Sequence, residues 1–322
     1  MEKFYFAPLE GISGYVYRKA YEHYFGGIDK YFIPFIKPNQ KGKLSSREKN
    51  DILPMHNQGM CAIPQILTNS AEDFIKTAER LGEYGYEEVN LNLGCPSGTV
   101  TAKGKGAGFL AHPDDLDRFF DEVFAKCEGI SVKTRLGVHE ASEFDKLLEI
   151  YNRYPITELT IHPRVRQDFY KGKVRESDFA AALPRCSMPV CYNGDLITER
   201  DVSAVSERYP DLPAVMIGRA LIADPSLVMR LTGGKAADAK MLETFHDTLF
   251  VRYCEAFGDS RIAMLRMKEI WFYHLNLFEN SEKTGKAIKK AKNAAEFQAA
   301  AATVFRDCRV RANAVPLWFK PA

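Results

Sequence analysis

The chain has 322 residues, of which 46% are hydrophobic and 27% are charged, and its net charge is +2. This is an ordinary globular composition, and the length allows a barrel of roughly 200–250 residues plus a smaller domain. The N-terminus does not read as a signal peptide, no apolar run approaches the roughly 18–20 residues that cross a bilayer, and the seven cysteines lack zinc-site or C-x-x-C spacing, so we expect a cytoplasmic protein with reduced thiols.

Strand-like runs alternate with helical patterns over the first 235 residues. The helical segments carry start signals: Ser70 precedes one, Pro113 opens another and Thr198 precedes a third. The predicted strands are 3–8, 30–36, 62–67, 88–94, 130–137, 158–164, 189–195 and 214–220. Eight such units predict a parallel (β/α)8 TIM barrel over residues 1–235. The alternative is an open doubly wound sheet, which usually needs fewer strands, and no G-x-G-x-x-G follows the first strand.

Two segments depart from this alternation. Residues 37–61 are polar and rich in glycine and lysine, with only a short helical stretch. After Gly233 and Gly234 the strand signals stop, and 241–257, 260–277 and 293–309 carry helical apolar spacing. We therefore expect a small all-helical C-terminal domain over residues 240–322.

The predicted tail domain is basic. It holds 14 Lys and Arg against 9 Asp and Glu, a net charge of +5, whereas residues 1–239 carry −3. The densest cluster is "KTGKAIKKAK" at 283–292. Such a cluster fits either a solvated helix face or a surface for nucleic-acid phosphates, and both interpretations stay open here.

Polar residues stand at the ends of most predicted strands. Catalytic groups of TIM barrels gather at these C-terminal ends, and buried polar groups are costly unless something binds them. The residues in question are Glu10, Gln65, Asn92, Cys95, Lys133, Arg135, His162, Arg164, Asn193, Asp195 and Arg219. Together they predict a polar active site.

The residue types narrow the ligand. No H-E-x-x-H and no cluster of metal ligands occurs in the sequence, so we expect no metal. The "NGD" and "GRA" segments that end the last two strands fit the usual phosphate site of such barrels, where Arg219 would add a charge-assisted hydrogen bond. A phosphate at one end, an amide near the middle and a lysine against an electron-rich ring point to flavin mononucleotide (FMN).

At this point the sequence resembles the tRNA-dihydrouridine synthases. The blocks that carry the resemblance are "APLEGISG" (7–14), "PQI" (64–66), "NLNLGCPSGTV" (90–100), "GKGAGFL" (104–110), "VKTRLG" (132–137), "TIHPRVR" (160–166), "YNGD" (192–195) and "MIGRALI" (216–222). Their order and spacing are specific, although each block alone is weak. The resemblance implies reduction of the C5=C6 bond of uridine in tRNA by FMN, with NADPH as the reductant.

The resemblance also implies roles for individual residues. Cys95 would be the catalytic acid, and Asn92 and Arg164 would lie beside the flavin or the uracil. The residues that would bind FMN are Pro8, Leu9, Glu10, Gln65, Lys133, His162, Asn193, Gly194, Asp195, Gly218 and Arg219. The residue types add a separate hypothesis: the glycine-rich segment after Cys95 is a mobile flap, and its Lys103 and Lys105 would meet RNA phosphates.

Three other functions stay open on the sequence. A flavin barrel could act on a free pyrimidine, as a dihydroorotate or dihydropyrimidine dehydrogenase does, but such an enzyme has no need of a basic helical tail. The RNA could be rRNA in place of tRNA. The barrel could also be a non-catalytic RNA-binding module, which Cys95 and Lys133 argue against. We expect a monomer that does not associate with membranes.

Overall fold

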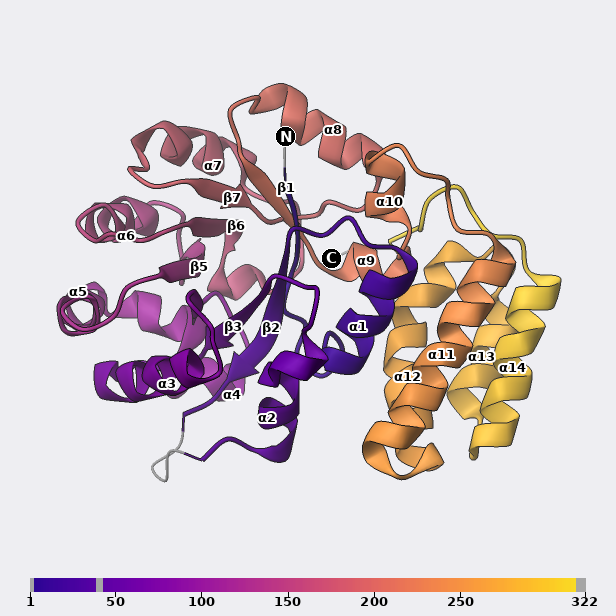
Figure 1. The fold of residues 1–322 in the computed structure, drawn as a ribbon. Helices are drawn as coiled ribbons and strands as arrows, with labels where there is room; N and C mark the ends of the chain where they lie inside the picture. Colours follow the sequence, from indigo (N-terminus) through magenta and orange to yellow (C-terminus); the bar gives the residue numbers. More distant parts are fainter. Residues whose placement is uncertain (1–2, 39–42, 317–322) are drawn as a thin grey trace.

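The computed structural model describes residues 3–38 and 43–316, and its centre is a closed barrel of eight parallel strands (Figure 1). Each strand pairs with its neighbours in chain order, and β8 pairs with β1. The strands are β1 (Lys3–Phe6), β2 (Lys30–Ile36), β3 (Ala62–Ile66), β4 (Val89–Leu93), β5 (Ile130–Gly137), β6 (Leu159–Val165), β7 (Val190–Tyr192) and β8 (Ala214–Ile217). The predicted parallel barrel is confirmed.

The last two strands end earlier than the sequence predicts. β7 stops at Tyr192, and Asp195 beyond it has a φ of 46°, which lies in the left-handed region and cannot continue an extended strand. β8 stops at Ile217, and Arg219 is already the first residue of α9 (Arg219–Ala223). The polar residues after these strands therefore stand in turns at the C-terminal end of the barrel.

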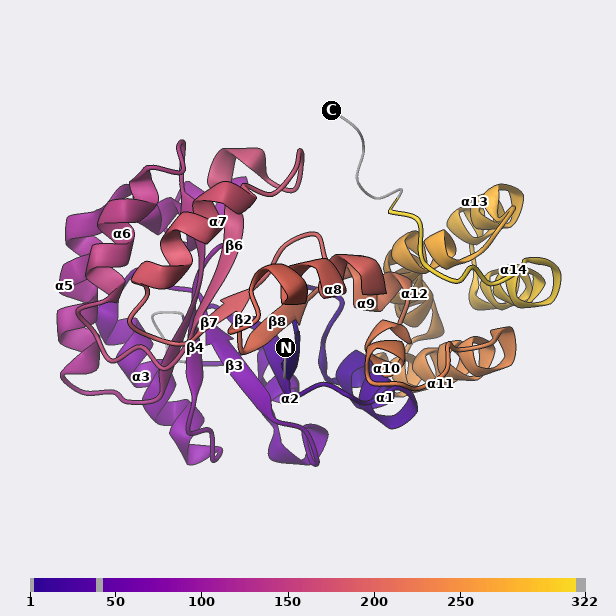
Figure 2. The ribbon, with the colours of Figure 1, turned by 90° about the horizontal axis from the view of Figure 1, so that it is seen from above.

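Helices surround the barrel on its outside (Figures 1 and 2). They are α1 (Tyr15–Tyr24), α3 (Ala71–Glu83), α5 (Pro113–Phe124), α6 (Glu143–Tyr151), α7 (Glu176–Ala182) and α8 (Glu199–Arg208). The predicted start signals are confirmed: Ser70 accepts from the Asp73 N–H at 3.2 Å, Thr198 forms a capping box with Asp201, and Pro113 opens α5.

The barrel interior changes from apolar to polar along the strands. The apolar layer is a buried cluster of Tyr5, Ala7, Phe32, Ile63, Cys191, Ala214 and Met216. Nearer the C-terminal ends, the strand register places Asn92 beside Lys133 and Arg135 beside His162. The apolar layer closes one end of the barrel, and the polar layer faces the end where its loops open.

The chain after the barrel is helical, as predicted. Short α10 (Leu227–Leu231) leads to α11 (Ala239–Phe257), α12 (Ser260–His274), α13 (Glu282–Lys290) and α14 (Ala294–Asp307). Gly258 ends α11 in the left-handed conformation, and Asp259 caps α12 by accepting from the Arg261 N–H at 2.7 Å. α13 covers most of the lysine cluster. That these helices are a domain separate from 1–235 stays a prediction.

These C-terminal helices lie to one side of the barrel (Figures 1 and 2). α11 packs against α1, and α12 packs against α9, which follows the last strand. His274, at the end of α12, is buried and its imidazole lies close to the backbone of Ile222 and Ala223 in α9. The C-terminal helices therefore border one side of the barrel opening. Within the described residues, no helix is both long and apolar enough to cross a membrane.

The polar connection between β2 and β3 contains α2 (Ser46–Ile52) and a 3-10 turn (Pro54–His56). Residues 39–42 of this connection lie outside the described residues. Ser45 and Glu48 form the capping box that starts α2. The fully buried guanidinium of Arg18 in α1 donates to the Asp51 carbonyl at 2.8 Å and to Asn57 Oδ1 at 2.9 Å. This buried network holds α2 against α1, next to the loop that follows β1.

Candidate active site

A cavity of about 460 Å³ opens at the C-terminal ends of the strands, where the sequence places the active site. It collects most of the predicted residues, from the ends of six different strands. Those that line it are Pro8, Leu9, Glu10, Asn92, Cys95, Lys133, His162, Asn193, Gly194, Asp195, Gly218 and Arg219. Residues far apart in the sequence thus converge on one cavity.

Four predicted residues do not line the cavity: Gln65, Arg164, Lys103 and Lys105. Gln65 lies below the cavity wall. It is fully buried, accepts from Asn92 Nδ2 at 2.6 Å and donates to Asn90 Oδ1 at 2.7 Å. Its amide therefore orients Asn92, which does line the cavity.

Cys95 is held in position by the same chain of amides. Asn92 Oδ1 accepts from the N–H groups of Gly94 at 3.1 Å and Cys95 at 2.9 Å, so the Asn92 side chain closes the turn that ends β4. Burial raises the pKa of the Cys95 thiol above its ordinary value. The thiol therefore stays protonated at neutral pH and can donate a proton.

The glycine-rich segment after Cys95 is packed in this structure. It forms the short helix α4 (Gly98–Thr101) and a 3-10 turn (Gly106–Ala111), and the Ala107 N–H donates to the Cys95 carbonyl at 3.0 Å. A Cβ on Gly106 would lie 2.9 Å from the same carbonyl oxygen, closer than real Cβ contacts. The glycines thus allow close packing around Cys95. Lys103 is exposed on the outer side of this segment.

Lys133 enters the cavity from β5. Its Nζ donates to Asn193 Oδ1 at 2.7 Å, and Asn193 Nδ2 donates to the Met216 carbonyl at 2.7 Å, which fixes the amide orientation. Burial, and then the positive charge of Arg135, lower the pKa of Lys133 to about 7. An anionic ligand beside this amine would favour its charged form.

His162 and Arg164 form a unit at the end of β6. Arg164 is fully buried; its guanidinium donates to His162 Nε2 at 3.0 Å and to the Asp195 carboxylate at 2.5 Å. Because an arginine only donates, Nε2 must accept and the imidazole proton must sit on Nδ1. Burial, together with the cations Arg135, Lys133, Arg164 and Arg219, holds the pKa of His162 well below its ordinary value, so the ring is a neutral hydrogen-bonding group.

Arg219 lies at the junction of the last two strand ends. Its guanidinium is 3.6 Å from Asp195 Oδ1, and it packs over the Tyr170 ring at 4.9 Å from the centroid. Asp195 is thus shared between Arg164 and Arg219, and its charge is compensated within the site. Burial lowers the pKa of Arg219 from its ordinary value.

Cavity residues beyond the predicted flavin and substrate contacts include Arg135, Tyr170 and Phe272. Arg135 was predicted as a strand-end residue on the same face of β5 as Lys133, and it lines the cavity. Its guanidinium donates to the carbonyls of Gly94 at 2.9 Å and Phe169 at 2.7 Å, and so links the Cys95 turn to the loop after β6. Tyr170 and Phe272 carry no local sequence signal.

The loop after β6 places Tyr170 over the cavity. Phe169 has a φ of 51°, an unfavourable value for a bulky residue, and its carbonyl is held by Arg135. Two guanidinium groups lie over the Tyr170 ring, with Arg135 Cζ at 5.3 Å and Arg219 Cζ at 4.9 Å from its centroid. The strained backbone at Phe169 thus directly precedes Tyr170, whose ring lines the cavity.

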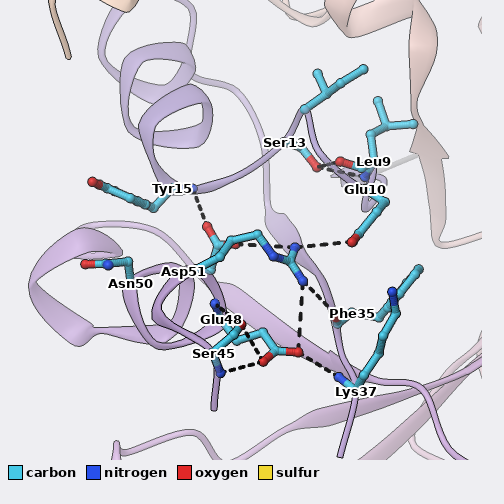
Figure 3. A network of polar contacts seen from close by, with 12 residues as sticks. Leu9, Glu10, Ser13, Tyr15, Phe35, Lys37, Ser45, Glu48, Asn50 and Asp51 are labelled. Carbon is cyan, nitrogen blue, oxygen red and sulfur yellow. Dashed lines mark hydrogen bonds and ion pairs between the residues drawn. The ribbon is translucent and has the colours of Figure 1, made fainter. Parts of the chain in front are cut away.

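Glu10 joins the cavity to α2. The guanidinium of Arg47 lies 3.3 Å from Glu10 and 3.9 Å from Asp51. The other oxygen atoms that point toward it belong to Glu48 and the Phe35 carbonyl (Figure 3). The connection after β2 therefore orients the cavity-facing loop after β1.

The site has the character of a pocket for a polar, anionic organic ligand. Its charged groups are mainly cations, and its candidate acid is a thiol. Across residues 3–38 and 43–316, no group of three or more His, Cys, Asp or Glu is arranged to hold a metal ion.

Comparisons relate the chain to one enzyme family. Residues 6–312 match the family model described as "Dihydrouridine synthase (Dus)". The chain is 27% identical over 293 residues to the tRNA-dihydrouridine(16) synthase of Cupriavidus necator, covering 84% of this chain and 89% of that protein. It is 26% identical over 248 residues to tRNA-dihydrouridine synthase B of Pasteurella multocida, covering 75% and 72%.

Similar solved structures share the fold. Morphinone reductase superposes with a TM-score of 0.53 at 14% identity, covering 74% of this chain and 87% of that one. The old yellow enzyme homologue of Zymomonas mobilis superposes with a TM-score of 0.52 at 12% identity, covering 71% and 88%. At such identities the likeness shows the barrel architecture and nothing about the ligand.

Proposed function

Since the chain belongs to the dihydrouridine synthase family, we propose that it reduces the C5=C6 bond of a uridine in tRNA, with FMN as its bound flavin and NADPH as the reductant. The observation that carries the proposal is one cavity that holds both the Cys95 thiol and the Lys133 amine. Burial keeps the thiol protonated and lowers the pKa of the amine to about 7, so that a ligand can change its charge. Reduction of a pyrimidine needs a proton donor and a group that compensates negative charge.

The cavity residues fit FMN. The volume of about 460 Å³ lies within the ordinary range for cofactor sites. Gly218 presents bare backbone to the cavity, where an added Cβ would lie 3.3 Å from the Ala7 Cβ. With Gly194 and Arg219 it would hold the phosphate, at the strand ends where barrels usually bind one. Lys133, fixed by Asn193, would lie against the polar edge of the ring system.

Cys95 would supply the proton of the reaction. The chemistry that FMN would supply in this cavity is a hydride for uracil C6, with NADPH as the source of its electrons. The Cys95 Sγ–H bond breaks as its proton passes to C5, and the resulting thiolate takes a proton from solvent. The raised pKa of this thiol keeps it protonated beforehand. Asn92 would hold both the Cys95 turn and one edge of the uracil, and positively charged Lys133 would stabilise the electron-rich flavin.

The substrate proposal rests on the relatives and on charge. The two curated relatives are named for tRNA, and the C-terminal residues 240–322 of this chain carry a net charge of +5. A uridine in folded RNA must leave its stack to enter a cavity of this kind. The basic helices would bind the phosphate backbone of the RNA outside the cavity, whatever its base sequence. Lys103 and Lys105 would add to that surface. An enzyme for free pyrimidines would not use such a surface.

The purified protein tests the proposal. We expect it to carry FMN, to have that flavin reduced by NADPH, and to form dihydrouridine in tRNA from cells that lack the gene. Parallel reactions on rRNA and on free uracil and orotate test the two alternatives. A protein that takes up no flavin on reconstitution, or that reduces only a free pyrimidine, would contradict the proposal. We also propose a cytoplasmic monomer, which size-exclusion chromatography and cell fractionation check.

A further inference from the structure

One exposed aromatic side chain stands at the entrance of the cavity without a role in the proposed chemistry. Phe272, on α12, lines the cavity and yet is 59% exposed. A single exposed aromatic residue means little by itself. Phe272 differs because a nucleotide entering the cavity must pass the residues that line its opening.

The packing of α12 fixes the side of the helix from which Phe272 projects. Its neighbours Trp271 and His274 are buried, at 1% and 4% exposure, and lock the rotation of the helix. The Phe272 ring meets the Tyr273 ring edge to face, with centroids 5.1 Å apart. The helix packing therefore fixes the backbone position from which the exposed Phe272 ring projects at the cavity entrance.

α12 is also fixed against the barrel at both ends of the opening. At one end, a Cβ on Gly11 would lie 2.8 Å from Arg266 Nη1, so the helix abuts the loop after β1. At the other end, Tyr273 lies close enough to Arg219 for that charge to influence its pKa. Phe272 thus has a defined position relative to the groups that would hold the flavin.

Exposed lysines lie on α13, the helix that packs beside α12. The Lys268 amine of α12 donates to the Lys289 carbonyl at 3.2 Å, which joins α12 to the end of α13. The exposed lysines of α13 are Lys283, Lys286, Lys289 and Lys290. An aromatic platform beside clustered cations is the arrangement by which proteins bind unstacked nucleotides. A protein partner would have to cover the entrance through which the substrate passes.

We propose that Phe272 stacks on a base of the RNA next to the uridine that enters the cavity, and so positions that uridine. This role rests on the proposed function, because it assumes an RNA substrate. It assigns Phe272 to substrate positioning and leaves the chemical step to the groups inside the cavity. Removing the ring should weaken RNA binding without affecting the flavin.

The test compares Phe272→Ala with Phe272→Tyr, which keeps an aromatic ring. Phe257→Ala is the matched control, since Phe257 is 40% exposed at the end of α11 and does not line the cavity. The readouts are the Kd and KM for tRNA, kcat, the FMN content, and the rate of flavin reduction by NADPH without RNA. From the usual energy of one base–aromatic stack, we expect Phe272→Ala to raise Kd and KM roughly 5- to 100-fold. Its FMN content, flavin reduction and kcat should stay close to wild type, and the other two variants should behave like wild type.

Unchanged Kd and KM in Phe272→Ala would overturn the stacking role, as would an equal loss in Phe257→Ala. Loss of flavin from Phe272→Ala would also overturn it, because the residue would then support the cofactor site. Failure of the proposed function looks different. In that case the wild-type protein forms no dihydrouridine, whatever the variants do to RNA binding.

Discussion

Cys95 differs from an inert buried thiol in its surroundings. Its turn is closed by the Asn92 side chain, its carbonyl is held by the segment that follows, and burial raises the pKa of its thiol. Replacing Cys95 by Ala should leave the FMN content unchanged and lower kcat on tRNA by about 10²- to 10⁴-fold, the usual contribution of a positioned acid. Because protonated thiol is the active form, wild-type turnover should persist to a higher pH than an ordinary thiol pKa of about 8.5 allows. Stopped-flow turnover across a pH series measures both effects.

Lys133 would act on the flavin through its charge. Its pKa of about 7 reflects burial and the neighbouring Arg135, and an electron-rich ligand would pull the amine toward its charged form. Replacing Lys133 by Met keeps the length of the side chain and removes the charge. We expect the midpoint potential of the bound flavin to become more negative by on the order of 30 mV, one tenfold step for a two-electron couple. A potential equal to wild type would remove Lys133 from this role.

At the scale of elements, the junction of α12 with α9 should be sensitive to acid. Burial, and then nearby His246, lower the pKa of His274 to about 4, from an ordinary value of 6.5. The unfolded chain therefore binds the proton more readily, and the free energy of unfolding falls as the pH drops from about 6.5 toward 4. For this one group we expect a loss of about 2 kcal/mol between pH 7 and pH 5.

Urea unfolding of wild type and of His274→Gln at the two pH values isolates this contribution. His162 titrates in the same direction, so only the difference between the two proteins reports on His274. The wild type should lose about 2 kcal/mol more than the variant. Equal losses would show that His274 does not control the acid sensitivity of this junction.

The strand and helix pattern was predictable because it depends on local spacing, whereas the depth of a side chain in the barrel depends on register. Gln65 pairs in register with Asn90, one layer below Asn92, and therefore lies beneath the cavity. Arg164 alternates with His162 in sequence, but a register irregularity follows Arg135 and His162 in the β5–β6 ladder. Arg164 ends fully buried behind its neighbour. No pattern within α12 distinguishes Phe272, since only its packing against the barrel brings it to the cavity.

At the scale of the whole molecule, the slightly acidic barrel would hold the reaction site, and the basic C-terminal helices would bind the RNA. The affinity for tRNA should fall steeply with salt, because each phosphate contact releases counterions. Replacing Lys286 and Lys289 by Ala should reduce the magnitude of the slope of log K against log salt by about 1.4 to 1.8, which is the effect of losing two phosphate contacts. Lys19 and Lys126, which are exposed on α1 and just beyond α5, serve as the control pair. An unchanged slope in the α13 variant would place the RNA elsewhere.

The central claim is that this chain forms dihydrouridine in tRNA, and position-resolved mapping of the base tests it most directly. Dihydrouridine is mapped in tRNA and rRNA from cells with the gene, from cells without it, and from cells complemented with wild type or with Cys95→Ala. We predict that dihydrouridine disappears from a defined tRNA position when the gene is removed, and that wild type restores it while Cys95→Ala does not. An identical map with and without the gene, or a loss confined to rRNA, would contradict the account.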